Sequence, residues 1–179
     1  MVRSFLSGSC LSMLIFAPTV VVADEAVALS KLSKSAFLEQ YEAYFVSSLE
    51  VAQTLLNRLD PTMGTLIDTD TPVRDVERVS FECTYDYMSE AGTLIQLAQQ
   101  VLLLDELEDM VAADQGMDYA DLAMNETLLE QQTSLGDGLF EALSACDAME
   151  INSARYDLRP GVWSAIEEAG RARGYITDD

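Results

Sequence analysis

The sequence predicts an all-α protein: a three- or four-helix bundle built on a long antiparallel helical hairpin that one disulfide staples. Glycine and proline are scarce, with 9 and 4 among 179 residues, and they cluster at a few breaks. No segment alternates apolar and polar residues for long enough to form a strand. Apolar residues instead recur at steps of three and four, which is the period of an amphipathic helix.

The first 23 residues are expected to be a secretory signal peptide that is cleaved. Arg3 supplies the basic start, residues 5–16 supply an apolar stretch, and Val21-Val22-Ala23 supplies the small residues of a cleavage site. A retained N-terminal anchor is the alternative, although serine, glycine and proline interrupt the stretch too often for a good membrane span. We therefore expect an exported protein, periplasmic or secreted, without a membrane partner after cleavage.

The rest of the chain is expected to fold as one domain. Its length is ordinary for a domain that buries its own core. No internal repeat or low-complexity segment divides it. Residues 24–34 are the expected lead-in, residues 35–174 the helical bundle domain, and residues 175–179 a C-terminal tail.

The first helix of the domain is expected at residues 35–59. Ser33 or Ser35 can cap its start, and Asp60-Pro61 should end it. Its apolar residues recur at helical steps and predict one buried face. This face consists of Tyr41, Phe45, Leu49, Ala52, Leu55, Leu56 and Leu59.

A second helix is expected to begin at Thr71-Pro72. A capping hydroxyl is followed there by proline at the first helical position, where the missing N–H costs nothing. The helix should run to Ala113, and Gln115-Gly116 should break it. Its predicted buried stripe consists of Val76, Val79, Cys83, Tyr87, Ala91, Leu94, Ala98 and Leu102.

A third helix is expected from Asp118 to as far as Tyr156, with Gly136-Asp137-Gly138 as a kink or a break. The last helix is expected at residues 161–173, where Gly174 is a natural stop. The predicted buried residues of these two helices are Leu122, Leu129, Leu139, Leu143 and Cys146 in the third and Trp163 and Ile166 in the last.

Cys83 and Cys146 are the cysteines that remain after signal cleavage, and an even count in an exported protein predicts a disulfide. Free buried thiols are the alternative. The two residues lie 31 positions before Asp114 and 31 positions after Gln115, so a helical hairpin that turns there brings the sulfurs level. The same turn sets Gly92 opposite Gly136-Asp137-Gly138, where the missing side chains would let two backbones approach closely.

Charge is distributed unevenly along the chain, whose net charge is −21. From Val79 to Ala154, 76 residues contain 16 Asp and Glu and no Lys or Arg. A negative electrostatic field disfavours nucleic acid and anionic membranes as partners and favours basic proteins and divalent cations.

The hairpin is expected to separate basic from acidic residues. Its foot should carry four arginines, which either pair with local carboxylates or bind a ligand: Arg74, Arg78, Arg155 and Arg159. The carboxylates expected at the hairpin tip, which are the candidate partner-binding residues, are Asp105, Glu106, Glu108, Asp109, Asp114, Asp118 and Asp121.

The chain contains no histidine, which excludes several kinds of catalytic and metal-binding site. The commonest general base, the Ser-His and Cys-His nucleophile pairs and the usual zinc and di-iron ligand sets are thereby lost. Two oxidised cysteines also offer no thiolate nucleophile. We expect no cofactor and no enzymatic activity, and a hydrolase that works with carboxylates alone is the remaining catalytic alternative.

These observations predict an exported acidic helical interaction protein that binds a basic protein, in the manner of an inhibitor or an immunity protein. Calcium binding is the alternative function, because calcium takes carboxylate oxygens as ligands. Asp114, Asp118 and Asp121, which are closely spaced around the predicted turn, are the candidate calcium ligands.

Overall fold

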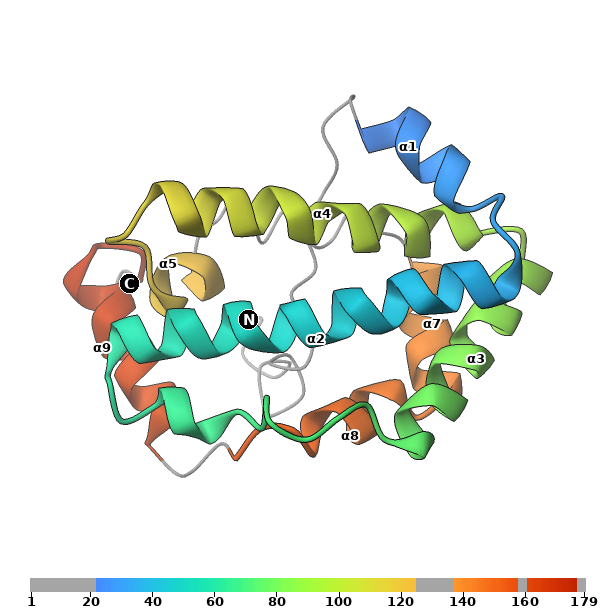
Figure 1. Cartoon of the computed structure of the whole chain (residues 1–179). Helices are drawn as coiled ribbons and strands as arrows, with labels where there is room; N and C mark the ends of the chain where they lie inside the picture. Colours follow the sequence, from blue (N-terminus) through green and yellow to red (C-terminus); the bar gives the residue numbers. More distant parts are fainter. Residues whose placement is uncertain (1–21, 125–136, 158–160, 177–179) are drawn as a thin grey trace.

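The computed structural model describes residues 22–124, 137–157 and 161–176, and these residues form an all-α fold, as predicted (Figure 1). Within them no strand forms, although an isolated antiparallel bridge joins Ile67 to Tyr156. None of their helices is both long enough and apolar enough to cross a membrane. The helical elements are α1 (Val22–Leu29), α2 (Lys34–Leu59), the short 3₁₀ helix η2 (Gly64–Leu66), α3 (Asp75–Glu90), α4 (Leu94–Ala113), α5 (Tyr119–Met124), α7 (Asp137–Ala145), α8 (Ala148–Ser153) and α9 (Val162–Ala172).

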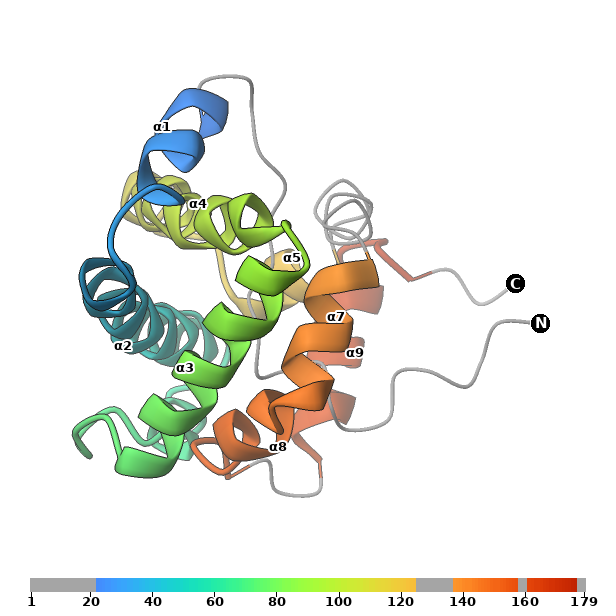
Figure 2. The same ribbon diagram turned by 90° about the vertical axis from the view of Figure 1, so that its right-hand side faces the viewer.

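The two long helices, α2 and α4, lie side by side and run in the same direction (Figure 1). Their C-terminal ends therefore meet at one end of the molecule, close to α5 and α9. Helix α1 packs on α4 and begins one residue before the predicted cleavage position at Ala23. At the other end, α3 packs on α7 and α8 (Figure 2). The C-terminal end of α2 thus lies near α4, α5 and α9, whereas its N-terminal end lies near α3.

Helix α2 begins and ends where the sequence predicts. The Ser33 side chain caps the first turn by accepting a backbone hydrogen bond, and Asp60 leaves the helix in an extended conformation. The predicted apolar face is buried except for Leu59, which is partly exposed. Phe37 and Tyr44 extend this buried face.

The second predicted helix is two helices, α3 and α4, and Gly92 separates them. Gly92 has φ +71°, and the N–H groups of Gly92 and Thr93 donate to the carbonyl oxygens of Ser89 and Met88. This pair of hydrogen bonds is a Schellman motif, which requires a left-handed residue that glycine supplies at low cost. The prediction that Gly92 allows close backbone approach is wrong, because a Cβ atom there would meet no atom within 4 Å.

Helix α3 begins at Asp75, so the predicted start at Thr71-Pro72 is also wrong. The Arg74 N–H donates to Oε2 of Glu77 at 2.6 Å, so the third residue of the helix satisfies the backbone of the residue before its true start. The carbonyl oxygens of Thr71 and Pro72 instead accept hydrogen bonds from Arg155, at 2.6 and 2.8 Å. Because these carbonyls point at Arg155, they cannot accept bonds along a helix.

The buried side of α3 lies one residue away from the predicted stripe. Val76, Val79 and Tyr87 are 49%, 67% and 38% exposed. The predicted stripe and the residues that are actually buried both recur at helical steps, so the period alone does not distinguish them. The buried set contains polar residues, which are typical of a solvent-facing side and therefore favoured the wrong prediction. The residues of α3 that are buried are Glu77, Ser80, Phe81, Thr84 and Met88.

The third and last predicted helices are confirmed in part. The described parts of the predicted third helix form α5, α7 and α8, and Asp147, with φ +52°, breaks the helix between α7 and α8. Residues 125–136, including Leu129 and the first glycine of the predicted kink, lie outside the described residues. Helix α9 and the positive φ of Gly174 match the predicted last helix and its stop. The predicted residues that are buried are Leu122, Leu139, Leu143, Cys146 and Ile166, while Trp163 is partly buried.

An ion pair between Glu77 and Arg155 lies in the core, with side chains 0% and 1% exposed. The Nε and Nη2 atoms of Arg155 donate to the Glu77 carboxylate at 2.6 and 2.7 Å. The other N–H groups of Arg155 donate to the carbonyl oxygens of Asp68, Thr71 and Pro72, so all five donors are used. One guanidinium thereby joins α3, the loop before it and the chain that follows α8.

The same contacts control the pKa of Glu77. Burial alone would raise the pKa, but hydrogen bonds from Arg155 and Arg74 outweigh burial and lower it from 4.5 to about 2. The folded protein therefore keeps Glu77 ionised at pH values where the unfolded chain binds a proton there.

We expect Glu77 to make the free energy of unfolding depend on pH below about 4.5. Its contribution is about 3 kcal/mol above this pH and is lost as the pH falls towards 2, because the unfolded chain then gains a proton. Glu77→Gln should lower stability at pH 7 by about 3 to 5 kcal/mol, since it leaves Arg155 without its counter-ion. Urea unfolding of both proteins between pH 7 and pH 2.5 measures these effects. Glu82→Gln, on the exposed side of α3, is the control, and an unchanged pH slope in Glu77→Gln would contradict this assignment.

Gly92 and Gly138 should respond to alanine with opposite signs. Gly92→Ala should cost about 1 kcal/mol because alanine must adopt the left-handed conformation. Gly138→Ala should stabilise α7 by about 0.5 to 1 kcal/mol, since the helical glycine has ordinary space for a Cβ, with Oε1 of Gln96 at 3.6 Å. Thermal unfolding of the two variants measures both changes. A destabilised Gly138→Ala would show instead that α7 needs a close backbone approach.

Candidate functional site

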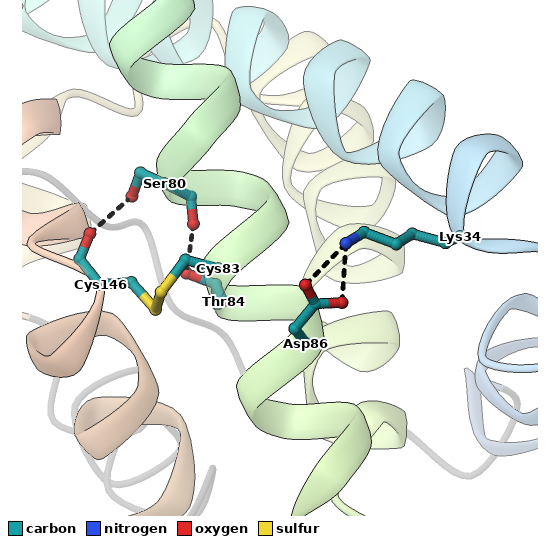
Figure 3. The surroundings of a disulfide bond; sticks show 6 residues. All are labelled: Lys34, Ser80, Cys83, Thr84, Asp86 and Cys146. Carbon is teal, nitrogen blue, oxygen red and sulfur yellow. Dashed lines mark hydrogen bonds and ion pairs between the residues drawn. A yellow bond between two sulfur atoms is a disulfide. The ribbon is translucent and has the colours of Figure 1, made fainter.

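Cys83 and Cys146 form the predicted disulfide, which joins α3 to the turn between α7 and α8 (Figure 3). The alternative of two free thiols is therefore wrong. The Ser80 hydroxyl donates to the Cys146 carbonyl at 3.0 Å, and the Thr84 hydroxyl donates to the Ser80 carbonyl at 2.9 Å. In the chain-entropy model a bridge across 63 residues stabilises the fold by about 4 kcal/mol. These contacts give the cysteines a structural role.

Three of the predicted partner-binding carboxylates share one exposed face of α4. Asp105, Glu108 and Asp109 are spaced at i, i+3 and i+4, and all three are exposed. Helix α4 has no Lys or Arg of its own, and none of the three makes an ion pair within the described residues. Like charges at these spacings repel one another. Glu106 lies in the same helix, and its side chain is outside the described part of the structure.

A groove of about 340 Å³ runs between α2 and α4 beside these carboxylates. Glu50 of α2 and Glu108 of α4 line it from its two walls, and Val51 and Val111, which are 7% and 6% exposed, also line it. Arg58 lines the same groove. A carboxylate on each wall suits the charged head of a lysine or arginine side chain.

Arg58 caps the C-terminal end of α4 from the last turn of α2. Its Nη1 atom donates to the carbonyl oxygens of Asp114 and Met117, and Nη2 donates to that of Val111, each at 3.0 Å. The last carbonyls of a helix lack helical partners and carry partial negative charge. Because α2 and α4 end together, the guanidinium brings positive charge to the negative end of the α4 dipole.

Asp118 and Asp121 are held by the end of α9 rather than presented to solvent. Asp118 is 4% exposed, and its two carboxylate oxygens accept hydrogen bonds from Nη1 and Nη2 of Arg173. Asp121 accepts hydrogen bonds from the Asp118 N–H at 2.8 Å and from the Tyr175 hydroxyl at 2.9 Å. Burial raises the pKa of Asp118, but hydrogen bonds from Arg173 and the Ala120 N–H outweigh burial and hold it below its usual value.

The calcium alternative remains a prediction, and its three candidate ligands lie in different surroundings. Asp114 is exposed and accepts a hydrogen bond from the Gly116 N–H at 2.9 Å, whereas Asp118 and Asp121 both face Arg173. Asp114 and Asp121 line an open concavity of about 650 Å³. Over the described ranges, no group of three or more carboxylates or cysteines is arranged to hold a metal ion.

The described arginines that were predicted at the foot of the hairpin pair with carboxylates. This was one of the two interpretations given above, and ligand binding was the other. Arg155 and Arg74 contact Glu77, while Arg78 contacts Glu42 at 3.0 Å and Asp75 at 3.6 Å. Arg159 lies outside the described residues. The expected separation into an acidic tip and an arginine-bearing foot is wrong, because Arg58 and Arg173 lie at the tip.

Sequence reasoning missed Glu50, Arg58 and Arg173 as parts of this region. Arg58 is the basic residue in the last turn of α2, which is a recognisable signal for a C-terminal cap. Its acceptors follow 53 to 59 positions later, and Glu50 faces Glu108 only because α2 and α4 run parallel. No local pattern predicts either contact.

Comparison of the chain with protein-family models, with curated proteins and with solved structures finds no match.

Arg173→Met should destabilise the fold by about 2 kcal/mol because it leaves Asp118 buried without its cation. The loss should be smaller than for a fully buried pair, since the Arg173 side chain is 34% exposed. Urea unfolding at pH 7 measures the loss, with Arg171→Met as the control because Arg171 and Glu167 are both about half exposed. Equal effects of the two substitutions would contradict the role given to Asp118.

Proposed function

We propose that this protein is an exported acidic interaction protein that binds a basic protein through the groove between α2 and α4. The observation that carries the proposal is the face formed by Asp105, Glu108 and Asp109, with Glu50 across the groove. These four carboxylates are exposed and make no ion pair within the described ranges. A partner's lysines or arginines would relieve the repulsion along α4.

Charge acts at two distances in this proposal. The net charge of −21 attracts a basic partner from afar and speeds association. The groove then supplies local complementarity, because Glu50 and Glu108 place a carboxylate on each of its two walls. An inhibitor or an immunity protein that binds a basic exported enzyme or toxin is a concrete form of this function.

The proposal excludes most of the α4–α5 turn from partner binding. Asp118 and Asp121 already contact Arg173, so a partner would have to compete with an internal guanidinium. Asp114 is exposed and lies next to Arg58, whose Nη1 atom binds its carbonyl oxygen. The carboxylates further back along α4 carry no such competition.

Asp105→Asn, Glu108→Gln and Asp109→Asn in one chain should abolish capture of the basic partner. The matched control is Glu141→Gln, Glu150→Gln and Glu168→Gln, which removes the same charge from exposed sites on α7, α8 and α9. Each purified protein is immobilised and incubated with the exported proteins of the source cells at low and at high salt. We expect the wild type and the control to retain the same basic protein at low salt, and the groove variant to lose it.

Two results would contradict this proposal. Equal retention by the groove variant and its control would show that the field alone attracts the protein. Retention that high salt does not weaken would show that charge is not the main contribution, since salt screens exposed ion pairs.

A further inference from the structure

Helix α3 carries an exposed apolar face that we call the α3 stripe, formed by Val76, Val79, Cys83 and Tyr87. The two valines are 49% and 67% exposed, and Tyr87 is 38% exposed. Successive members are three, four and four residues apart, so they follow one side of the helix for about 16 Å. Figure 2 shows α3 at the surface, between α2 and the pair formed by α7 and α8. Cys83 fixes this side of α3 beside α8 through the disulfide.

Neither packing nor helix propensity accounts for the two valines. The core of α3 uses the neighbouring side of the helix, where Phe81 and Met88 are buried. Valine is also a poor choice for an exposed helical position, because its branched side chain loses rotamer freedom there. Single exposed apolar residues are common on protein surfaces, but an aligned set on one helix is typical of a helix-binding surface.

Acidic residues border the α3 stripe. Asp75 and Glu82 each precede a stripe residue by one position, which corresponds to g positions if Val76 and Cys83 are a positions of a heptad. Arg78 precedes Val79 in the same way and is engaged by Glu42 at 3.0 Å and by Asp75 at 3.6 Å. Glu82 and Glu90 are exposed and make no ion pair inside the described part of the chain. Asp86, by contrast, is paired with Lys34 at 2.7 Å (Figure 3). An occupant of this surface therefore meets apolar side chains with negative charge alongside.

We propose that the α3 stripe docks an amphipathic helix of a partner protein that carries lysine or arginine beside its apolar residues. A second copy of this chain is a poor occupant because it would bring Glu82 and Glu90 against their own counterparts. The stripe and the groove lie along different halves of α2, since α3 contacts Lys34 and Glu42 whereas the α2 residues of the groove lie between Ser47 and Arg58. The inference is therefore independent of the groove.

The test uses a synthetic helix of three heptads, with leucine at a and d and lysine at e and g, so that the peptide repels itself. Fluorescence anisotropy of the labelled peptide measures its binding to the full chain. Val76→Gln with Val79→Gln should weaken binding at least about tenfold, because two apolar contacts are lost. The groove variant Asp105→Asn, Glu108→Gln and Asp109→Asn should bind as the wild type does. A peptide with glutamate at e and g should not bind.

Several outcomes would overturn the inference. They are failure of the lysine peptide to bind the wild type, equal binding by the Val76→Gln, Val79→Gln variant, and loss of binding in the groove variant. Sedimentation of the wild type as a dimer that the valine variant dissociates would assign the stripe to a second copy instead. Circular dichroism melting checks that the exposed valine substitutions leave the fold intact. Because the peptide does not use the groove, failure here leaves the proposed function standing.

Discussion

The buried pair of Glu77 and Arg155 is the constraint on which the rest of the fold depends. Two charges without solvent are tolerated only when each meets partners, and here one guanidinium meets a carboxylate and three carbonyl oxygens. To provide them, the chain must bring α3, the loop before it and the residues after α8 to one point. That convergence also places α3 against α7 and α8, where Cys83 and Cys146 can join.

Arginine rather than lysine holds this chain together, and the charge balance explains why. The chain has 10 basic residues against 31 acidic ones, and eight of the ten are arginine. A scarce cation is most effective where it satisfies several acceptors at once, which the five donors of a guanidinium allow. Arg58 binds three carbonyl oxygens at the end of α4, and Arg173 binds two oxygens of Asp118. Of the described cations only Arg155 is buried, but Arg58 and Arg173 also each bind more than one acceptor.

The sequence predicted those features of the fold that depend on neighbouring residues, and it did not predict those that depend on contacts between distant residues. The bounds of α2, its cap at Ser33, the last helix and the disulfide follow from periodicity, capping and cysteine count, and all were predicted correctly. The start of α3 and its buried side were predicted wrongly because Arg155, 78 positions from Glu77, turns a polar residue inward. The same limit applies to the site. The exposure of the α4 carboxylates was expected. The groove was not predicted, because it forms only when α2 and α4 run parallel, and no local pattern gives their relative direction.

The exposed surface is acidic because the chain has 31 acidic residues against 10 basic ones, and several of the arginines are engaged with partners within the fold. Cations that neutralise Glu77, Asp118 and the end of α4 are not available to the face of Asp105, Glu108 and Asp109. A single-chain fold could have relieved that repulsion with one lysine a turn away, since such pairs stabilise helices. Helix α4 contains none, so it supplies no positive charge of its own to this face. This repulsion on an ordered helix beside a groove is the feature on which the proposal of a basic partner rests.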